Sequence, residues 1–340
     1  MTDVTPKPRA RARTLKTWSA FGNLGRRPTE YEIVTHNMNH TNGAIPLEMG
    51  PDVHGNVWLR KHRDSMRLKV EDWDAFRDPD SVTYGTYVAG QDDQETYVEG
   101  LLEQFDNDGY DEALSAEALA LLFRVLTPSR YLAHGQQMLS AYLQQLAVSS
   151  YVSNCAAFQT ADQLRRVQLT SYRTTQLRLT HEGDAQGERR HWEGSPDWQG
   201  IRKVVELALV EFDWDRAFVI TNLVLKPLAD LITIDQLSAQ ASAVGATLDS
   251  LVLENLYRDS LRSQRWTSAL VTFLTGADPA NRDVLQEYLD EFAPLAEELI
   301  TSGVALLSTP GGQSSADIEA AVRSGWAGLL EPLGLRTIGS

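Results

Sequence analysis

The 340-residue sequence predicts an all-α protein in which four long helices form a core bundle. Three observations support this prediction. From about residue 92 onward, apolar residues recur at helical spacing. Strand-like alternation of apolar and polar residues is almost absent along the whole chain. The first ninety or so residues lack helical periodicity and are rich in proline, so they do not resemble a compact domain of their own.

The predicted helices follow one another with short breaks. The stretch DDQETYVEGLLEQFD opens with acids, which suit a helix N-terminus, and the next helix begins at Ser115 as N-cap and ends near Pro128. A polar loop with glycines and Pro196 follows residue 181. Pro227 separates two further helices. The remaining predicted helices are 130–152, 155–179, 200–224, 226–245, 248–275, 281–304 and 314–330.

This pattern divides the chain into three parts: an irregular arm (1–90), a helical bundle (91–275) and C-terminal helices (276–340). The arm contains large aromatic residues, which a disordered tail would lack, and such residues anchor interfaces. We therefore expect the arm to pack on a partner subunit, with packing of each aromatic onto its own bundle as the equally weighted alternative. The candidate interface residues are Trp18, Arg26, Arg27, Tyr31, Trp73, Phe76 and Arg77.

The charge distribution bears on possible partners. The formal net charge is −15, which argues against nucleic acid, because binding phosphates needs a basic surface. The first 27 residues are the exception, because one acid, Asp3, stands among many cations. Such an arm suits a nucleic-acid-associated regulator or contact with an acidic partner subunit, and the acidic body favours the second. The cations are Lys7, Arg9, Arg11, Arg13, Lys16, Arg26 and Arg27.

Cysteine content and hydropathy bear on the compartment. A single cysteine, Cys155, excludes an internal disulfide and a cysteine-based metal site, and its small and apolar neighbours predict a packed core thiol. No apolar run near 18 residues and no signal-peptide pattern stand out. We therefore expect a cytoplasmic protein without a membrane span.

Two helices carry residues at the spacing of a di-iron ligand motif. In di-iron bundles, two helices each supply Glu-x-x-His, whose members share one face. Here Gln163 and Arg166 stand at that spacing, and Asp259 and Arg262 repeat it. Arginine stays protonated and cannot ligate a cation, so no iron site is expected. These pairs are either ordinary surface contacts or residues that meet at the bundle centre and fill the volume of a lost metal pair. No other catalytic set stands out.

Several stretches together resemble a known family. TLKTWSAFGNLGRRPTEYEIVTHNMNH and VEDWDAFRDPDSVTYGTYVAGQDDQETYVEGLLEQFD resemble the β subunit of the hydroxylase of soluble bacterial di-iron multicomponent monooxygenases, in the toluene/alkene/isoprene group. The similarity is dense over residues 15–110 and weaker to about 275. It implies a ferritin-like subunit, with Gln163 and Asp259 at glutamate ligand positions and Arg166 and Arg262 at histidine positions.

The resemblance also implies a function and partners. The chain would be a non-catalytic structural subunit, binding no cofactor, of a two-fold α, β and γ assembly whose α subunit holds the di-iron centre. The assembly would oxygenate small hydrocarbons (an alkene, isoprene or an aromatic such as toluene) using O₂ and NADH-derived electrons. An effector protein, a Rieske-type ferredoxin and a reductase would act on it. The alternative is a free-standing ferritin-like protein or oxidase with an unrecognised metal site.

Overall fold

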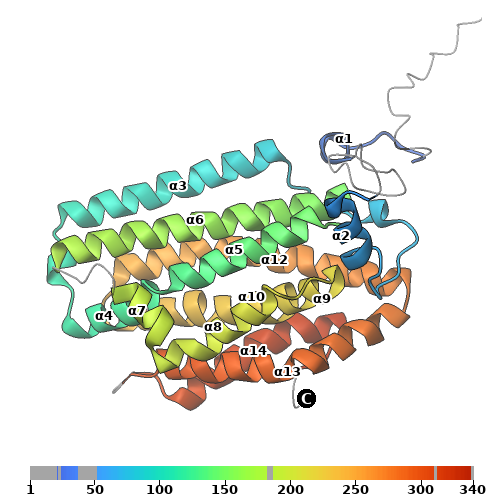
Figure 1. Ribbon diagram of the computed structural model, residues 1–340. Coiled ribbons are helices and arrows are strands. Elements are labelled where there is room, and N and C mark those ends of the chain that lie inside the picture. Colours follow the sequence, from blue (N-terminus) through green and yellow to red (C-terminus); the bar gives the residue numbers. More distant parts are fainter. Residues whose placement is uncertain (1–20, 22–23, 37–51, 182–186, 310–311, 338–340) are drawn as a thin grey trace, which may run out of the picture.

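The computed structural model describes residues 21, 24–36, 52–181, 187–309 and 312–337. Within these ranges the chain is helical and contains no strand, which confirms the predicted all-α class. The long helices run side by side in a layered bundle, with α13 and α14 on the opposite side from α3 (Figure 1). The α-helices are α1 (Glu30–Thr35), α2 (His54–His62), α3 (Tyr84–Asn107), α4 (Ala116–Leu121), α5 (Ser129–Gln145), α6 (Ser150–Thr180), α7 (Gly187–Gly194), α8 (Pro196–Ala208), α9 (Trp214–Phe218), α10 (Lys226–Asp230), α11 (Leu237–Ala243), α12 (Thr247–Ala277), α13 (Ala280–Leu307) and α14 (Ser315–Leu330).

Helix α3 begins earlier than the sequence suggested. Thr83 caps it, since its side chain accepts a hydrogen bond from the Thr86 backbone N–H at 3.2 Å. The Thr86 hydroxyl in turn accepts from the Thr83 backbone N–H at 2.9 Å, which completes a reciprocal capping pair. The expected helix start near residue 92 was therefore wrong by two turns, because threonine can replace the acidic partner of a usual capping box.

The break predicted at Pro227 was also wrong. The chain breaks between α8 and α9, with Asp213 as N-cap, and then stays helical from Trp214 to Ala243. Pro227 lies at the start of α10, directly after the π-helical segment η5 (Val219–Leu225), and a second π segment, η6 (Leu231–Gln236), follows. In a π-helical segment the hydrogen bonds join residues five apart instead of four, so the hydrogen-bond pattern of the backbone shifts at this point. Proline has no backbone N–H to donate, and it can be accommodated where the regular pattern is interrupted.

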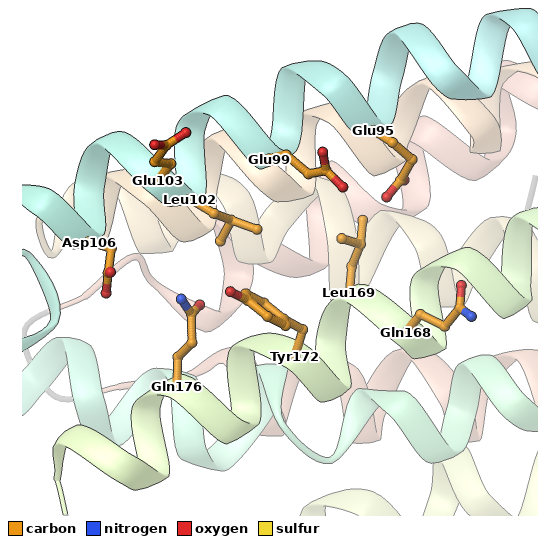
Figure 2. Close-up of a pocket in the computed structure, with 9 residues that line it drawn as sticks. All are labelled: Glu95, Glu99, Leu102, Glu103, Asp106, Gln168, Leu169, Tyr172 and Gln176. Carbon is orange, nitrogen blue, oxygen red and sulfur yellow. The ribbon is translucent and has the colours of Figure 1, made fainter.

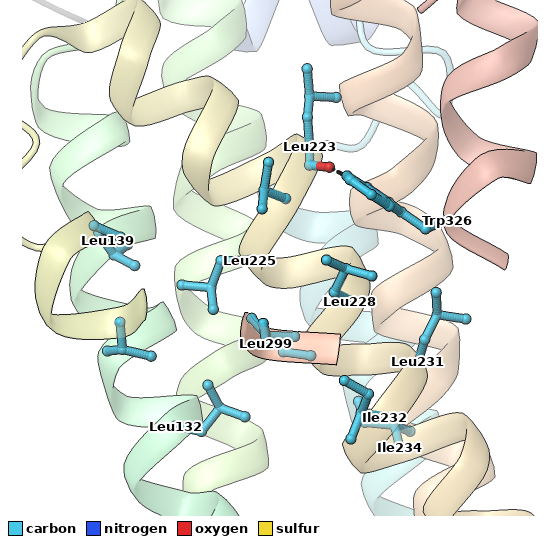
Figure 3. Close-up of a cluster of buried hydrophobic side chains, with 14 of the residues drawn as sticks. Leu132, Leu139, Leu223, Leu225, Leu228, Leu231, Ile232, Ile234, Leu299 and Trp326 are labelled. Atoms are coloured by element: carbon cyan, nitrogen blue, oxygen red, sulfur yellow. Dashed lines mark hydrogen bonds between the residues drawn. The ribbon is translucent and has the colours of Figure 1, made fainter. Parts of the chain in front are cut away.

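This long central helix forms the core of the bundle. Its apolar side chains pack between α5 on one side and α13 and α14 on the other (Figure 3). The Trp326 indole N–H of α14 donates to the Leu223 carbonyl at 2.7 Å, which satisfies a backbone group in the core. Trp214–Ala243 contains an 18-residue window with a mean hydropathy of 1.6, which is apolar enough to span a membrane, so the expectation that no such apolar run exists was wrong. The most apolar window of that stretch is entirely buried inside the bundle, so it is a core helix.

The described part of the N-terminal arm packs on its own bundle. Tyr31 is 4% exposed and Phe76 is 1% exposed, and both belong to the main hydrophobic core. The Trp73 ring packs edge-on against Trp214 at a centroid distance of 6.0 Å. These three aromatics were interface candidates, but in this chain they anchor the arm to α9, α12 and α6. Aromatic residues in an irregular segment do not reveal which surface they bury against.

The charged interface candidates behave differently from one another. Arg26 and Arg77 both hydrogen-bond to the carboxylate of Glu32, at 2.7 and 3.0 Å, and together they hold the pKa of Glu32 well below its usual range. Arg77 also lies over the Tyr151 ring at 4.0 Å. Arg27 is exposed. Trp18 lies outside the described residues.

Helix α3 is loosely attached to the bundle. Among its 24 residues only Val98 and Leu102 are buried. Between α3 and α6 lies a groove of about 600 Å³, into which side chains of both helices point (Figure 2). The apolar spacing that predicted this helix therefore corresponds to a narrow apolar contact between α3 and the bundle, made by Val98 and Leu102.

Candidate functional site: buried charge in the bundle interior

Helix α6 carries charged side chains on its buried faces. Asp162, Arg165, Arg166 and Arg173 are each less than 10% exposed. Buried charges are costly unless they are paired and hydrogen-bonded. Each of these side chains is paired, and the pairs form three separate clusters along the helix.

The first cluster joins α6 to α12. Arg165 donates from Nη1 to Asp259 Oδ2 at 3.0 Å. Arg262 donates to Asp162 and, at 3.3 Å, to Asp259. Two guanidinium groups therefore face two carboxylates, an arrangement in which the Coulomb attraction offsets part of the cost of burial.

Helix α3 covers this first cluster with polar side chains. The Tyr87 hydroxyl donates to Asp162 Oδ1 at 2.9 Å, and the amides of Gln91 and Gln94 donate to Asp259 at 3.1 and 3.3 Å. Glu95 pairs with Arg165. Polar contacts therefore hold this part of α3 where apolar packing is scarce.

Asp162 is the member of the cluster whose negative charge is destabilised by burial. Burial, reinforced by the negative charge of Asp259, raises the pKa of Asp162 to about 7, and Arg262 and Tyr87 oppose this rise. Its Oδ2 atom is buried and has no hydrogen-bond partner among the described residues. A proton on this carboxyl is thus favoured over much of the acidic range.

The second cluster lies between α6 and the central helix. Arg166 donates from Nη1 to Asp230 at 3.2 Å and from Nη2 to the Thr233 hydroxyl at 2.7 Å, and Lys226 pairs with the same aspartate. Burial lowers the pKa of Arg166, and the negative charge of Asp230 opposes this decrease. Gln163 is 3% exposed, and its Oε1 has no partner in the part of the chain that is described.

The structure therefore does not bring the four predicted positions together. Asp259 and Arg262 belong to the first cluster, which faces α3, whereas Arg166 belongs to the second, which faces α10. Within the described ranges, no hydrogen bond joins Gln163 or Arg166 to either of the other two. The hypothesis of one central meeting point was wrong, because helical twist turns the two motifs to different neighbours. The interpretation as exposed surface contacts was also wrong, because Arg166 is 2% and Asp259 5% exposed.

Sequence reasoning missed the other interior polar groups. Arg173 bridges Asp249 and Asp111. An amide network also links the Gln159 and Asn222 side chains, which donate to each other at 3.2 and 3.1 Å. The available signal was a run of arginines and glutamines along 159–176 that was too long for one exposed face.

The interior does not suit a di-iron centre. Among the described residues, no group of three or more histidine, cysteine, aspartate or glutamate side chains could hold a metal ion. Where a carboxylate-rich bundle would need histidine and free carboxylates, Arg166 and Arg262 already pair with the available aspartates. A guanidinium offers only donors, so the residues present do not fit iron.

The comparisons with known proteins agree with this architecture. A family model described as Methane/Phenol/Alkene Hydroxylase matches residues 58–278. The hydroxylase component subunit beta of the toluene-4-monooxygenase system of Ectopseudomonas mendocina is 38% identical, covering 87% of this chain and 91% of that protein. The chain belongs to the Methane/Phenol/Alkene Hydroxylase family.

More distant members and solved structures extend the likeness. An oxygenase component of phenol 2-monooxygenase from Pseudomonas sp. strain CF600 is 27% identical, covering 79% of this chain and 80% of that protein. A solved structure of toluene 4-monooxygenase, with toluene bound in its resting active site, contains a chain that is 37% identical with a TM-score of 0.81, covering 90% of this chain and all of that one. A phenol hydroxylase structure from Pseudomonas sp. OX1 matches all of both chains with a TM-score of 0.83 at 21% identity, which bears on the fold alone.

Proposed function

We propose that this chain is the non-catalytic structural β subunit of a multicomponent hydroxylase that oxygenates small hydrocarbons with O₂ and NADH-derived electrons. The interior ion pairs carry the proposal. Arg165, Arg166 and Arg262 engage the carboxylates that a di-iron bundle would keep free for metal. The likeness to a toluene-4-monooxygenase hydroxylase β subunit supports the same assignment.

In this proposal the chemistry belongs to a partner subunit. An α subunit holds the di-iron centre, and a small γ subunit completes a two-fold assembly on which an effector protein, a Rieske-type ferredoxin and a reductase act. The whole system works in the cytoplasm, without nucleic acid or membrane as partner. Among the predicted contacts that the structure describes, Arg27 is exposed, belongs to the arm and forms no ion pair with the other described residues, so its side chain is a candidate to meet α.

Co-expression with the neighbouring reading frames tests the proposal. The mass of the purified assembly and the iron content of each component are measured together. We expect this chain to co-purify with a larger helical subunit that holds about two irons, and to hold none by itself. Iron bound in stoichiometric amount by this chain alone would favour the free-standing oxidase and reject the structural assignment.

Restoring the ligand motif gives a second, sharper test. We expect the combined variant Gln163→Glu, Arg166→His, Asp259→Glu and Arg262→His to bind no iron pair, because its two motifs face different neighbours and Lys226 and Asp230 remain in the interior. Iron titration followed by absorption spectroscopy measures this. Binding of two irons per chain would show that the interior can still assemble a ligand set.

A further inference from the structure

The groove between α3 and α6 has an acidic wall that is largely unpaired among the described residues. Glu95, Glu99, Glu103 and Asp106 line it from α3 at intervals of three or four residues, so they form one stripe. Glu95 pairs with Arg165, but within the described ranges Glu99, Glu103 and Asp106 form no ion pair. Like charges at this spacing repel one another along a helix. A cationic partner would remove that repulsion.

The groove also offers apolar and aromatic contacts. Leu102 of α3 and Leu169 of α6 line it from opposite sides, and Tyr172, which is 52% exposed, extends from α6 toward α3 (Figure 2). A half-exposed tyrosine ring beside a row of carboxylates suits arginine, whose guanidinium pairs with carboxylates and stacks on aromatic faces. The groove therefore fits a narrow segment with several arginines and small residues between them.

The chain contains such a segment near its N-terminus. The sequence KPRARAR, residues 7–13, places a cation at every second position and proline or alanine between them. In an extended chain every second side chain lies on the same face, about 6.6 Å apart. The acids on α3, four residues apart, are spaced by about 6 Å. The two rows of opposite charge therefore match in spacing as well as in sign.

The length of chain also permits this contact. The Phe21 ring lies 4.5 Å from the His36 ring, and His36 lies 6.1 Å from Tyr151 in the first turn of α6. From Tyr151 to Arg165, which marks the near end of the groove, α6 rises about 21 Å. The eight residue-to-residue steps from position 13 to position 21 span about 26 Å when extended. Arg13 can thus reach the Glu95 end of the groove.

We propose that the α3–α6 groove binds residues 7–13 of the same chain. Because α3 and α6 run in the same direction, the segment enters beside Glu95 and places Lys7 near Glu103 and Asp106. The arginines lie between them along the acidic stripe. This contact ties the basic start of the chain across the weakly packed helix α3, and it does not rest on the hydroxylase assignment.

Carbodiimide cross-linking of the full-length chain tests the proposal. The reagent condenses the Lys7 amine with a carboxylate, and peptide mapping by mass spectrometry locates the resulting amide bond. We expect a link from Lys7 to Glu103 or Asp106 within single chains at low salt. Raising the salt to about 0.5 M screens exposed charges and removes the link.

A matched pair of variants completes the test. We expect Glu99→Gln with Glu103→Gln to reduce the remaining Lys7 link to Asp106 and to speed tryptic cleavage after residues 9, 11 and 13 by roughly tenfold, because exposed ion pairs are individually weak but add along a row. Asp92→Asn with Asp93→Asn removes the same charge from exposed positions of α3 outside the groove, and should change neither measurement. Equal cleavage rates in all three proteins, or Lys7 linked to a second copy or to other acids, would overturn the proposal.

Discussion

Replacing Arg173 with methionine should cost this protein a large part of its stability. Arg173 is 2% exposed and donates to Asp249 at 3.0 and 3.3 Å and to Asp111 at 2.9 and 3.0 Å. The Asp249 side chain is fully buried, so the variant strands a carboxylate without its cation. Breaking a buried pair in this way costs about 3–5 kcal/mol, whereas whole domains are stable by about 5–15 kcal/mol.

The cost should depend on pH in a definite direction. Burial raises the pKa of Asp249, and Arg173 opposes that rise. Without the arginine the folded-state pKa rises further above the unfolded value, so the folded variant holds a proton that the unfolded chain releases. Its stability therefore increases as pH falls, and the loss relative to the parent is smaller at about pH 5 than at about pH 8.

Urea denaturation followed by circular dichroism at both pH values measures these effects. Arg189→Met is the matched control, because Arg189 forms an exposed pair with Glu193, and its midpoint should stay unchanged. Combining Arg173→Met with Asp249→Leu should recover at least half of the loss, since a buried pair can be exchanged for apolar residues. The reasoning fails if Arg173→Met is as harmless as the control, or if the double variant is less stable than the single one.

Three further outcomes follow from the interior. Because the pKa of Asp162 is raised to about 7, the folded state holds a proton that the unfolded state loses above about pH 4. The stability of the protein should therefore fall as pH rises from about 4 to 7. Asp162→Asn should flatten this pH dependence in urea denaturation, and an unchanged slope would contradict the raised pKa of Asp162. Phe76→Ala should lower the unfolding free energy by about 3–5 kcal/mol, because the ring is buried against Phe273 at 5.7 Å, while Val88→Ala at an exposed site should not; equal thermal midpoints would refute this. Cys155 is buried, which raises the pKa of its thiol, so a thiol reagent should label it only as fast as the chain unfolds, and immediate labelling in native buffer would show otherwise.

The helical fold was predictable because its signal is local. Apolar spacing of three and four residues identified the long helices, and a packed thiol at Cys155 followed from its small neighbours. The break at Pro227 misled because a π segment before it accommodates the proline, and that segment depends on surrounding packing.

The interior ion pairs were not predictable in the same way. Arg165 and Asp259 are separated by 94 residues, and Arg173 and Asp249 by 76. Their pairing depends on which faces of distant helices meet, and helical periodicity in a single sequence does not specify that rotation. For the same reason the spacing of Gln163, Arg166, Asp259 and Arg262 was visible, but their division between two clusters was not. The arm aromatics pose the same problem, since their partners lie on distant helices.

Helix α10, which lies between two π-helical segments and carries Lys226 and Asp230, limits which substitutions this chain can tolerate. Arg166 and Lys226 share the carboxylate of Asp230, so replacing one cation leaves the other paired with Asp230. Replacing Asp230 leaves two buried cations without a counterion, and replacing both cations leaves a buried carboxylate without one. A metal-binding interior would need this carboxylate free of both cations, so a path toward it passes through a variant with an uncompensated buried charge, or changes several positions at once. The order of substitutions therefore matters as much as their number.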